Sequence, residues 1–192
     1  MNMNQKIQEL ENLLRSREEG AKRNGAIENK QVEILNDCAG ELRSEFTDMG
    51  VQIDTKLLRN RRLRENQWVI KDNGKIIHSK STERDSWFDS KSFDAILPIT
   101  IKGSNHTLYF IMKGVDEQGG HQGNVKQEIA QYFRQIDNNV DDNTYFVFLL
   151  DGAYFKKELE RFSRPQMTEK YAIATSFNVK DIVKTYISEH LV

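Results

Sequence analysis

Acidic and basic side chains stand at defined places along residues 93–155, where strand-like and helix-like patterns alternate. Asp94 begins an apolar stretch typical of a strand, and Lys113 ends the next such stretch. Glu128 follows 15 residues after Lys113, in a segment of helical periodicity. Carboxylate oxygens are the ligands that Mg²⁺ prefers, and a lysine beside them balances negative charge. Two acidic residues and a lysine can therefore form a metal-dependent hydrolytic site, if the fold brings them together.

Several other catalytic classes lack their motifs. The pair Gly119–Gly120 is not followed by the Gly-Lys-Ser/Thr of a phosphate-binding loop, and the chain has no Gly-x-Ser-x-Gly, His-Glu-x-x-His or Gly-x-Gly-x-x-Gly motif. The 4 histidines are scattered without the spacing of metal ligands. The single cysteine, Cys38, lies on the apolar stripe of a helix, so we expect a buried thiol rather than a nucleophile.

The order of these features is similar to the core of type II restriction endonucleases of the PD-(D/E)XK class. In that family an acidic residue begins one strand and an acid-x-lysine motif lies on the next. A glycine-rich loop, an amphipathic helix and a buried strand with an Asp-Gly-like turn follow. The corresponding features of this chain are Asp94, Lys113, Gly119–Gly120, the helix with Glu128, and Asp151–Gly152. Residues 22–35 (KRNGAIENKQVEIL) also resemble the first helix of several such enzymes, and the resemblance covers about residues 20–190.

The resemblance implies a sequence-specific endonuclease that hydrolyses phosphodiester bonds of double-stranded DNA. Asp94 and Glu128 would hold Mg²⁺, and Lys113 would position the attacking water and balance charge. A homodimer is expected, because two sites related by a twofold axis cut both strands of a duplex.

One position departs from the family pattern. Two residues before Lys113, where the family has Asp or Glu, the chain has Ile111, which cannot bind a metal. Three explanations are open. The second acid has moved to the following helix as Glu128, as in a branch of the family; the chain is an inactive or helper version of the fold; or the sequence carries an inactivating substitution. We adopt the first, with a catalytically inactive DNA-binding or partner subunit as the alternative.

Each candidate also has a simpler interpretation. Asp94 can be an ordinary acid at a strand start, Lys113 a solvated lysine, and Glu128 an exposed helical glutamate. Asp116 and Glu117 are then loop acids, although one of them could assist metal binding. Glu28, near the start of the second predicted helix, could face the same site. An unrelated α/β interaction domain remains a third possibility for the whole chain.

A basic run precedes the segment of the candidate site. Residues 56–64 (KLLRNRRLR) contain five basic side chains, which are Lys56, Arg59, Arg61, Arg62 and Arg64. Such a run forms either a solvated face or a surface that contacts DNA phosphates, and we expect the second. Arg, Asn and Gln side chains that read bases are expected from loops around residues 59–66, 79–92 and 117–124.

Hydrophobic periodicity predicts a mixed α/β fold, with a restriction-endonuclease-like central sheet flanked by helices and an N-terminal helical arm. Helices are predicted over residues 3–19, 32–49, 124–138 and 179–191. Strands are predicted over residues 68–71, 75–78, 93–100, 107–113, 145–150 and 171–175, the first two joined by an Asn-Gly turn. We expect residues 1–50 to form an arm for packing or dimerisation and residues 51–192 to form the nuclease-like core of one compact domain.

Composition limits the remaining classes. The chain has 192 residues and a net charge of −1, which excludes a histone-like or polybasic membrane protein. It does not exclude a DNA enzyme, because the placement of the basic side chains matters more than their sum. No apolar run approaches the roughly 20 residues of a membrane span, and the first ten residues (MNMNQKIQEL) do not resemble a signal peptide. We therefore expect a cytoplasmic protein without a membrane partner.

Overall fold

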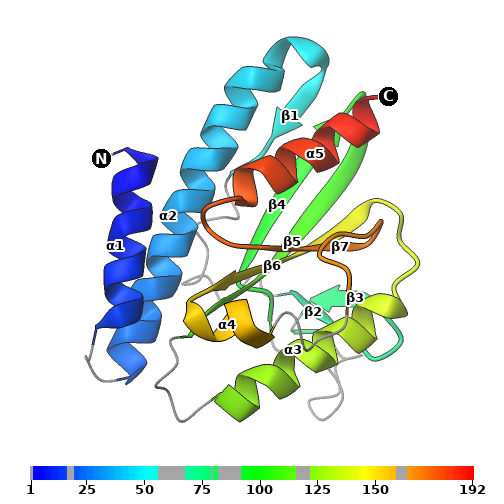
Figure 1. Ribbon diagram of the computed structural model, residues 1–192. Helices are drawn as coiled ribbons and strands as arrows, with labels where there is room; N and C mark the ends of the chain where they lie inside the picture. Colours follow the sequence, from blue (N-terminus) through cyan, green and yellow to red (C-terminus); the bar gives the residue numbers. More distant parts are fainter. Residues whose placement is uncertain are drawn as a thin grey trace.

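A five-stranded mixed sheet is the centre of the computed structural model, which describes residues 2–16, 20–55, 68–78, 80–81, 92–115, 122–158 and 164–192. Its strands, in spatial order, are β1 (Val51–Ile53), β4 (Ala95–Ile101), β5 (Ser104–Gly114), β6 (Thr144–Asp151) and β7 (Tyr171–Ala174). The pairs β1–β4 and β4–β5 are antiparallel, whereas β5–β6 and β6–β7 are parallel. The protein is therefore a mixed α/β protein, as the sequence predicts (Figure 1).

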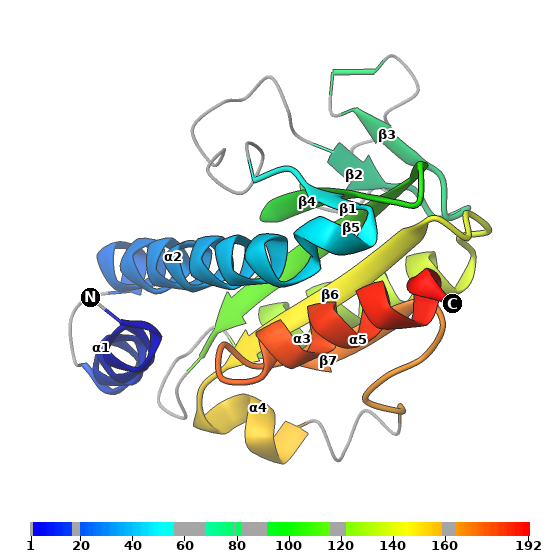
Figure 2. The ribbon, with the colours of Figure 1, turned by 90° about the horizontal axis from the view of Figure 1, so that it is seen from above.

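Three helices cover one face of this sheet. They are α1 (Met3–Arg15), α2 (Gly20–Phe46) and α5 (Val179–Leu191), and α1 runs beside α2 in both views (Figures 1 and 2). Their buried side chains, such as Leu14, Leu42 and Val183, belong to one cluster with the strand residues Leu108 and Val147. The N-terminal helices therefore contribute to the same hydrophobic core as the sheet, which makes them a layer of the fold.

The other face is covered by α3 (Gln122–Asp137) and by a small two-stranded sheet of β2 (Trp68–Ile70) and β3 (Ile76–His78). Residues Ile129, Phe133 and Ile136 recur at helical spacing and are buried in a second cluster on this face. All eight residues of β6 are buried, as expected for a central strand with helices on both sides. The helix α3 connects the parallel strands β5 and β6 and thus places its side chains over the end of β5.

Most predicted elements are present with shifted ends. The second helix ends at Phe46, three residues earlier than the stripe suggests, and passes into the 3-10 turn η1 (Thr47–Met49). Met49, expected on the buried stripe, is consequently 55% exposed. The edge strand β1 was not anticipated, since three residues carry too short a pattern to detect. A short helix α4 (Ala153–Glu158) follows β6.

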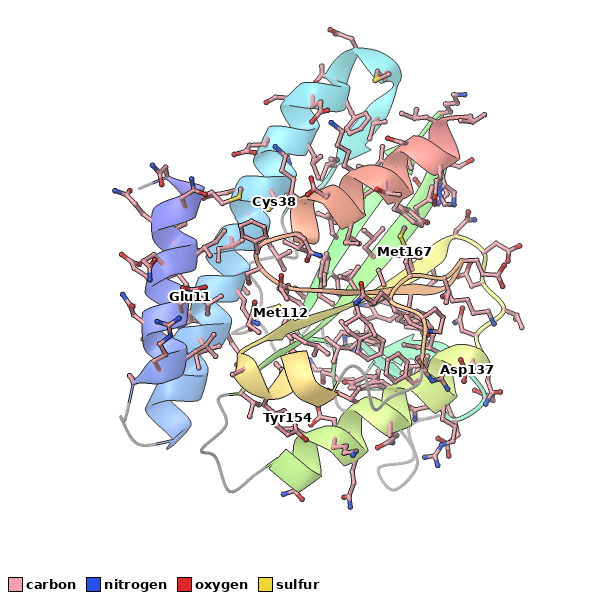
Figure 3. All side chains as sticks on the ribbon, viewed as in Figure 1. Glu11, Cys38, Met112, Asp137, Tyr154 and Met167 are labelled. Carbon is pink, nitrogen blue, oxygen red and sulfur yellow. The ribbon has the colours of Figure 1, made fainter. Side chains whose placement is uncertain are left out.

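The expected burial of Cys38 is confirmed. Its side chain is 2% exposed on α2, where Figure 3 labels it, and burial raises the pKa of the thiol to about 12. A thiol with this pKa carries almost no thiolate at neutral pH, so Cys38 is a core residue. None of the helices in the described ranges has the length and apolar character that crossing a membrane requires.

The turn between β2 and β3 is fixed against the end of α3. The Asn138 Nδ2 donates to the Asp72 carbonyl at 2.6 Å, and the Asn139 Nδ2 donates to the Gly74 carbonyl at 2.7 Å. Gly74 has φ +80°, and a Cβ there would overlap the backbone of Asn138 and Asn139. Glycine is therefore required at this position both for its conformation and for the close approach of two backbones.

We predict that Gly74→Ala destabilises the protein more than Gly103→Ala. Gly103 has φ +85° but open space around its Cα, so alanine there costs only the left-handed strain of about 1–2 kcal/mol. Overlap with the backbone of Asn138 and Asn139 adds about 1–3 kcal/mol at Gly74. Urea unfolding of both variants measures the difference in their free energies of unfolding. Equal losses of stability in the two variants would show that the turn can shift away from Asn138 and Asn139 without cost.

Candidate functional site

The β4–β5 hairpin places Asp94 beside the end of β5. The strands pair antiparallel from Ala95 opposite Phe110, and the Asp94 amide donates to the Phe110 carbonyl at 2.9 Å. Side chains alternate along β5, so Ile111 and Lys113 point to the same face, toward α3. The hairpin expected from the sequence is confirmed, with the acid and the lysine at the same edge of the sheet.

Asp94, Lys113 and Glu128 meet at this edge. The Lys113 Nζ lies 3.0 Å from the Glu128 Oε1 and 3.6 Å from the Asp94 Oδ2. The side chains are 16% (Lys113), 13% (Asp94) and 12% (Glu128) exposed. The Asp94 Oδ2 also accepts a hydrogen bond of 2.7 Å from the amide of Met112, which orients the carboxylate. The structure therefore brings together the three residues that the sequence singles out.

The two carboxylates determine the charge of Lys113. Burial by itself lowers the pKa of the ammonium, but the charges of Asp94 and Glu128 and their hydrogen bonds outweigh burial, so the pKa is raised above its ordinary value of 10.5. Lys113 is therefore a cation at neutral pH. It can donate hydrogen bonds to an anion but cannot accept a proton from water.

Ile111 is a core residue. Its exposure is 0%, and it belongs to the buried cluster that also contains Ile129 of α3 and Phe148 of β6. Glu128 directly precedes Ile129, so the packing of α3 on this cluster brings a carboxylate over the end of β5. In the family that the sequence resembles, the second acid occupies the position of Ile111. Here that position is apolar, and the acid beside Lys113 is Glu128 of α3.

A buried polar cluster lies on the opposite face at the same end of the sheet. The Gln31 Nε2 of α2 donates to the Asp151 Oδ2 at 2.7 Å. The Ser176 amide donates to the Asp151 Oδ1 at 2.9 Å, and its hydroxyl donates to the Asp151 Oδ2 at 2.7 Å. Burial raises the pKa of the Asp151 carboxyl, although these hydrogen bonds act in the other direction. The chain bends directly after Asp151, at Gly152, which has φ +110°.

Sequence analysis did not identify Gln31 or Ser176. The signal for Gln31 was its position four residues after Ile27 and three before Ile34, on the buried stripe of α2 where an apolar residue is the norm. Ser176 carried no signal, because a serine between a strand and a helix is commonplace.

Several predicted residues lie outside the described ranges. They are the basic residues Lys56, Arg59, Arg61, Arg62 and Arg64, the acids Asp116 and Glu117, and the pair Gly119–Gly120. The described chain resumes after residues 56–67 at Trp68, whose carbonyl accepts a hydrogen bond of 2.9 Å from the Phe93 amide. Trp68 therefore lies next to the residue that precedes Asp94. Glu28 lies on α2 one turn before Gln31, with its side chain half-buried.

The donor set at Lys113 fits a hard divalent cation. Two carboxylates, one from the start of β4 and one from α3, lie within ion-pair distance of a single nitrogen. Mg²⁺ is usually held by one or two carboxylates together with water and phosphate oxygens. Within the described residues no group of three or more His, Cys, Asp or Glu side chains is placed to hold a metal. A site for Mg²⁺ would therefore rest on these two carboxylates.

Comparisons of the chain with family models, with curated proteins and with solved structures gave no match.

We predict that Glu128→Gln lowers the pKa of Lys113. The variant removes the closer of the two negative charges and leaves the effect of burial in place, so the ammonium loses part of its stabilisation. The measurement is a pH titration of the Lys113 ¹³Cε signal in lysine-labelled protein, assigned through Lys113→Arg. Glu33→Gln on α2, which removes a carboxylate paired with Lys30, is the matched control and should leave the titration unchanged. An identical midpoint in Glu128→Gln would mean that Glu128 does not pair with Lys113 in solution.

Proposed function

We propose that this protein is a metal-dependent endonuclease for double-stranded DNA, of the type II restriction kind, with Asp94, Lys113 and Glu128 as its active site. The observation that carries the proposal is the meeting of two carboxylates and one ammonium at the edge of the sheet, at 3.0 and 3.6 Å. The mixed sheet between helices is compatible with a restriction-endonuclease-like fold. In this proposal Glu128 supplies the acid that Ile111 does not.

Asp94 and Glu128 would hold Mg²⁺ through their carboxylate oxygens. When bound, the ion supplies a nucleophilic water at neutral pH and neutralises charge on the phosphate. The tether from the Met112 amide keeps the Asp94 carboxylate in place, so only the Lys113 side chain has to move aside to make room. A lysine side chain has four rotatable bonds, and its movement therefore needs no change in the backbone.

Lys113 would act as a cation throughout the reaction. A lysine ammonium beside a phosphate keeps its proton at neutral pH, because the ordinary pKa of lysine lies well above 7, so its role would be to donate hydrogen bonds to the attacking water or to a phosphate oxygen. Negative charge increases on the phosphate and leaving-group oxygens as the bond from the attacking oxygen to phosphorus forms. Lys113 therefore stabilises the transition state electrostatically, and proton removal from water falls to another base or to solvent.

Contact with DNA would come from the basic run of residues 56–64, which lies outside the described residues. The residues that bracket the basic run are Thr55 and Trp68, and Trp68 bonds to the chain beside Asp94. Lys and Arg side chains on such a segment would neutralise phosphates near the scissile bond. A homodimer with two such sites would cut both strands, and this assembly belongs to the proposal.

The test is incubation of the purified protein with plasmid and genomic DNA in Mg²⁺ and, separately, in Mn²⁺. Discrete fragments are the expected product. Lys113→Met should lower the cleavage rate by about 10²–10³-fold, since it removes one preorganised donor to the developing charge. Asp94→Asn and Glu128→Gln should abolish cleavage while DNA binding persists, because each removes a metal ligand and not a phosphate contact.

The variant Ile111→Glu distinguishes the explanations for the missing acid. If Glu128 is the ligand, a glutamate at this fully buried position adds nothing to the site and destabilises the core. The assignment of Glu128 would be contradicted if Ile111→Glu created or increased DNA cleavage while Glu128→Gln left the cleavage rate unchanged. DNA binding without cleavage by the unaltered protein under every condition would support the inactive DNA-binding subunit instead.

A further inference from the structure

Gln31 contacts the backbone at the end of β5 from the face opposite to the candidate site. Its side chain is fully buried, and its Nε2 lies 3.4 Å from the Lys113 carbonyl and 3.4 Å from the Leu149 carbonyl. The same nitrogen makes its short hydrogen bond, 2.7 Å, to the Asp151 Oδ2. The side-chain amide of Gln31 thus contacts the ends of both β5 and β6, which are neighbouring parallel strands.

Asp151 is itself fixed in position. Its carboxylate accepts the amide and the hydroxyl of Ser176, and its carbonyl accepts the amide of Val115 at 2.9 Å. Asp151 is the register partner of Gly114, the residue that follows Lys113. The cluster therefore holds the backbone on the C-terminal side of Lys113, while Gln31 contacts the carbonyl of Lys113.

The helix α2 can come this close because of Gly114. A Cβ on Gly114 would overlap the Ile27 side chain and touch Leu14. Ile27 lies one turn before Gln31 on the same buried face of α2. The close approach of α2 at Gly114 therefore also brings the Gln31 side chain to the Lys113 carbonyl.

We propose that Gln31 is a positioning residue for Lys113: through the Lys113 carbonyl and Asp151 it holds the end of β5 so that the ammonium meets both carboxylates on the other face. The inference deepens the proposed function, because the residue that it positions is the one that would stabilise the transition state. Gln31 itself touches neither carboxylate of the site and would not contact substrate.

The test compares Gln31→Met with Gln135→Met. Both glutamines are fully buried, and both donate from Nε2 to an aspartate, Gln135 to Asp72 at 3.1 Å. Methionine keeps the length of the side chain and removes the donor. Both variants should unfold at lower urea concentration, since Gln31→Met takes one donor from the buried Asp151 carboxylate and Gln135→Met removes a part-buried hydrogen bond to the exposed Asp72.

Two readouts separate positioning from stability. The first is hydrogen exchange of the Lys113 ammonium in ¹⁵N spectra, which needs no catalytic activity. Exchange should accelerate in Gln31→Met and stay unchanged in Gln135→Met. The second is kcat for DNA cleavage, which should fall by about 10²-fold in Gln31→Met, the scale of a misplacement of about 1 Å, with little change in Gln135→Met.

The outcomes distinguish this inference from the proposed function. Absence of cleavage in the unaltered protein overturns the function, while the ammonium exchange still decides the role of Gln31. Equal ammonium exchange in Gln31→Met and the unaltered protein overturns the positioning role. If Gln31→Met does not fold, Gln31→Asn replaces it, because its shorter amide keeps its polarity but falls short of the Lys113 carbonyl and Asp151.

Discussion

The ion pairs of one buried ammonium with two carboxylates are the interaction on which the rest of this account depends. Asp94 and Glu128 come from different elements, and without the Lys113 cation two carboxylates would lie together in a largely buried place. Breaking such a group by removing one partner leaves an uncompensated charge, which costs several kcal/mol. The lysine between the acids compensates their charge, and in the proposed function the same acids would bind a metal once the lysine moves.

The sheet supplies the fixed frame around these three side chains. Antiparallel pairing of β4 with β5 sets Asp94 beside the end of β5, and the α3 crossover to β6 brings Glu128 over it. On the opposite face, the Gln31–Asp151–Ser176 cluster holds the backbone at the same end. The proposed site needs this arrangement, because a fixed backbone holds the two carboxylates while the lysine side chain would move to admit a metal.

The sequence predicted the mixed α/β class from patterns that are local in the chain, whereas it predicted the meeting of the three side chains from the order of features that resembles a nuclease family. Apolar stretches mark β4 and β5, most of whose residues are buried, and the helical spacing of Ile129, Phe133 and Ile136 marks α3. Gln31 could not be found in this way, since its partners lie more than 80 residues away. The exposure of Met49 was also missed, because a buried stripe gives no sign that the helix ends one turn early.

Whether Glu128 replaces the acid at position 111 can be tested most directly by locating a bound metal. Crystals soaked in Mn²⁺, which shares the oxygen ligands of Mg²⁺ and scatters anomalously, would give an anomalous difference map of the site. We expect a single peak at the end of β5, within about 2.0–2.3 Å of oxygens from both Asp94 and Glu128, with the Lys113 ammonium displaced from its present place. An unchanged Lys113 between the two carboxylates at saturating Mn²⁺, or a peak that involves Asp94 without Glu128, would contradict it.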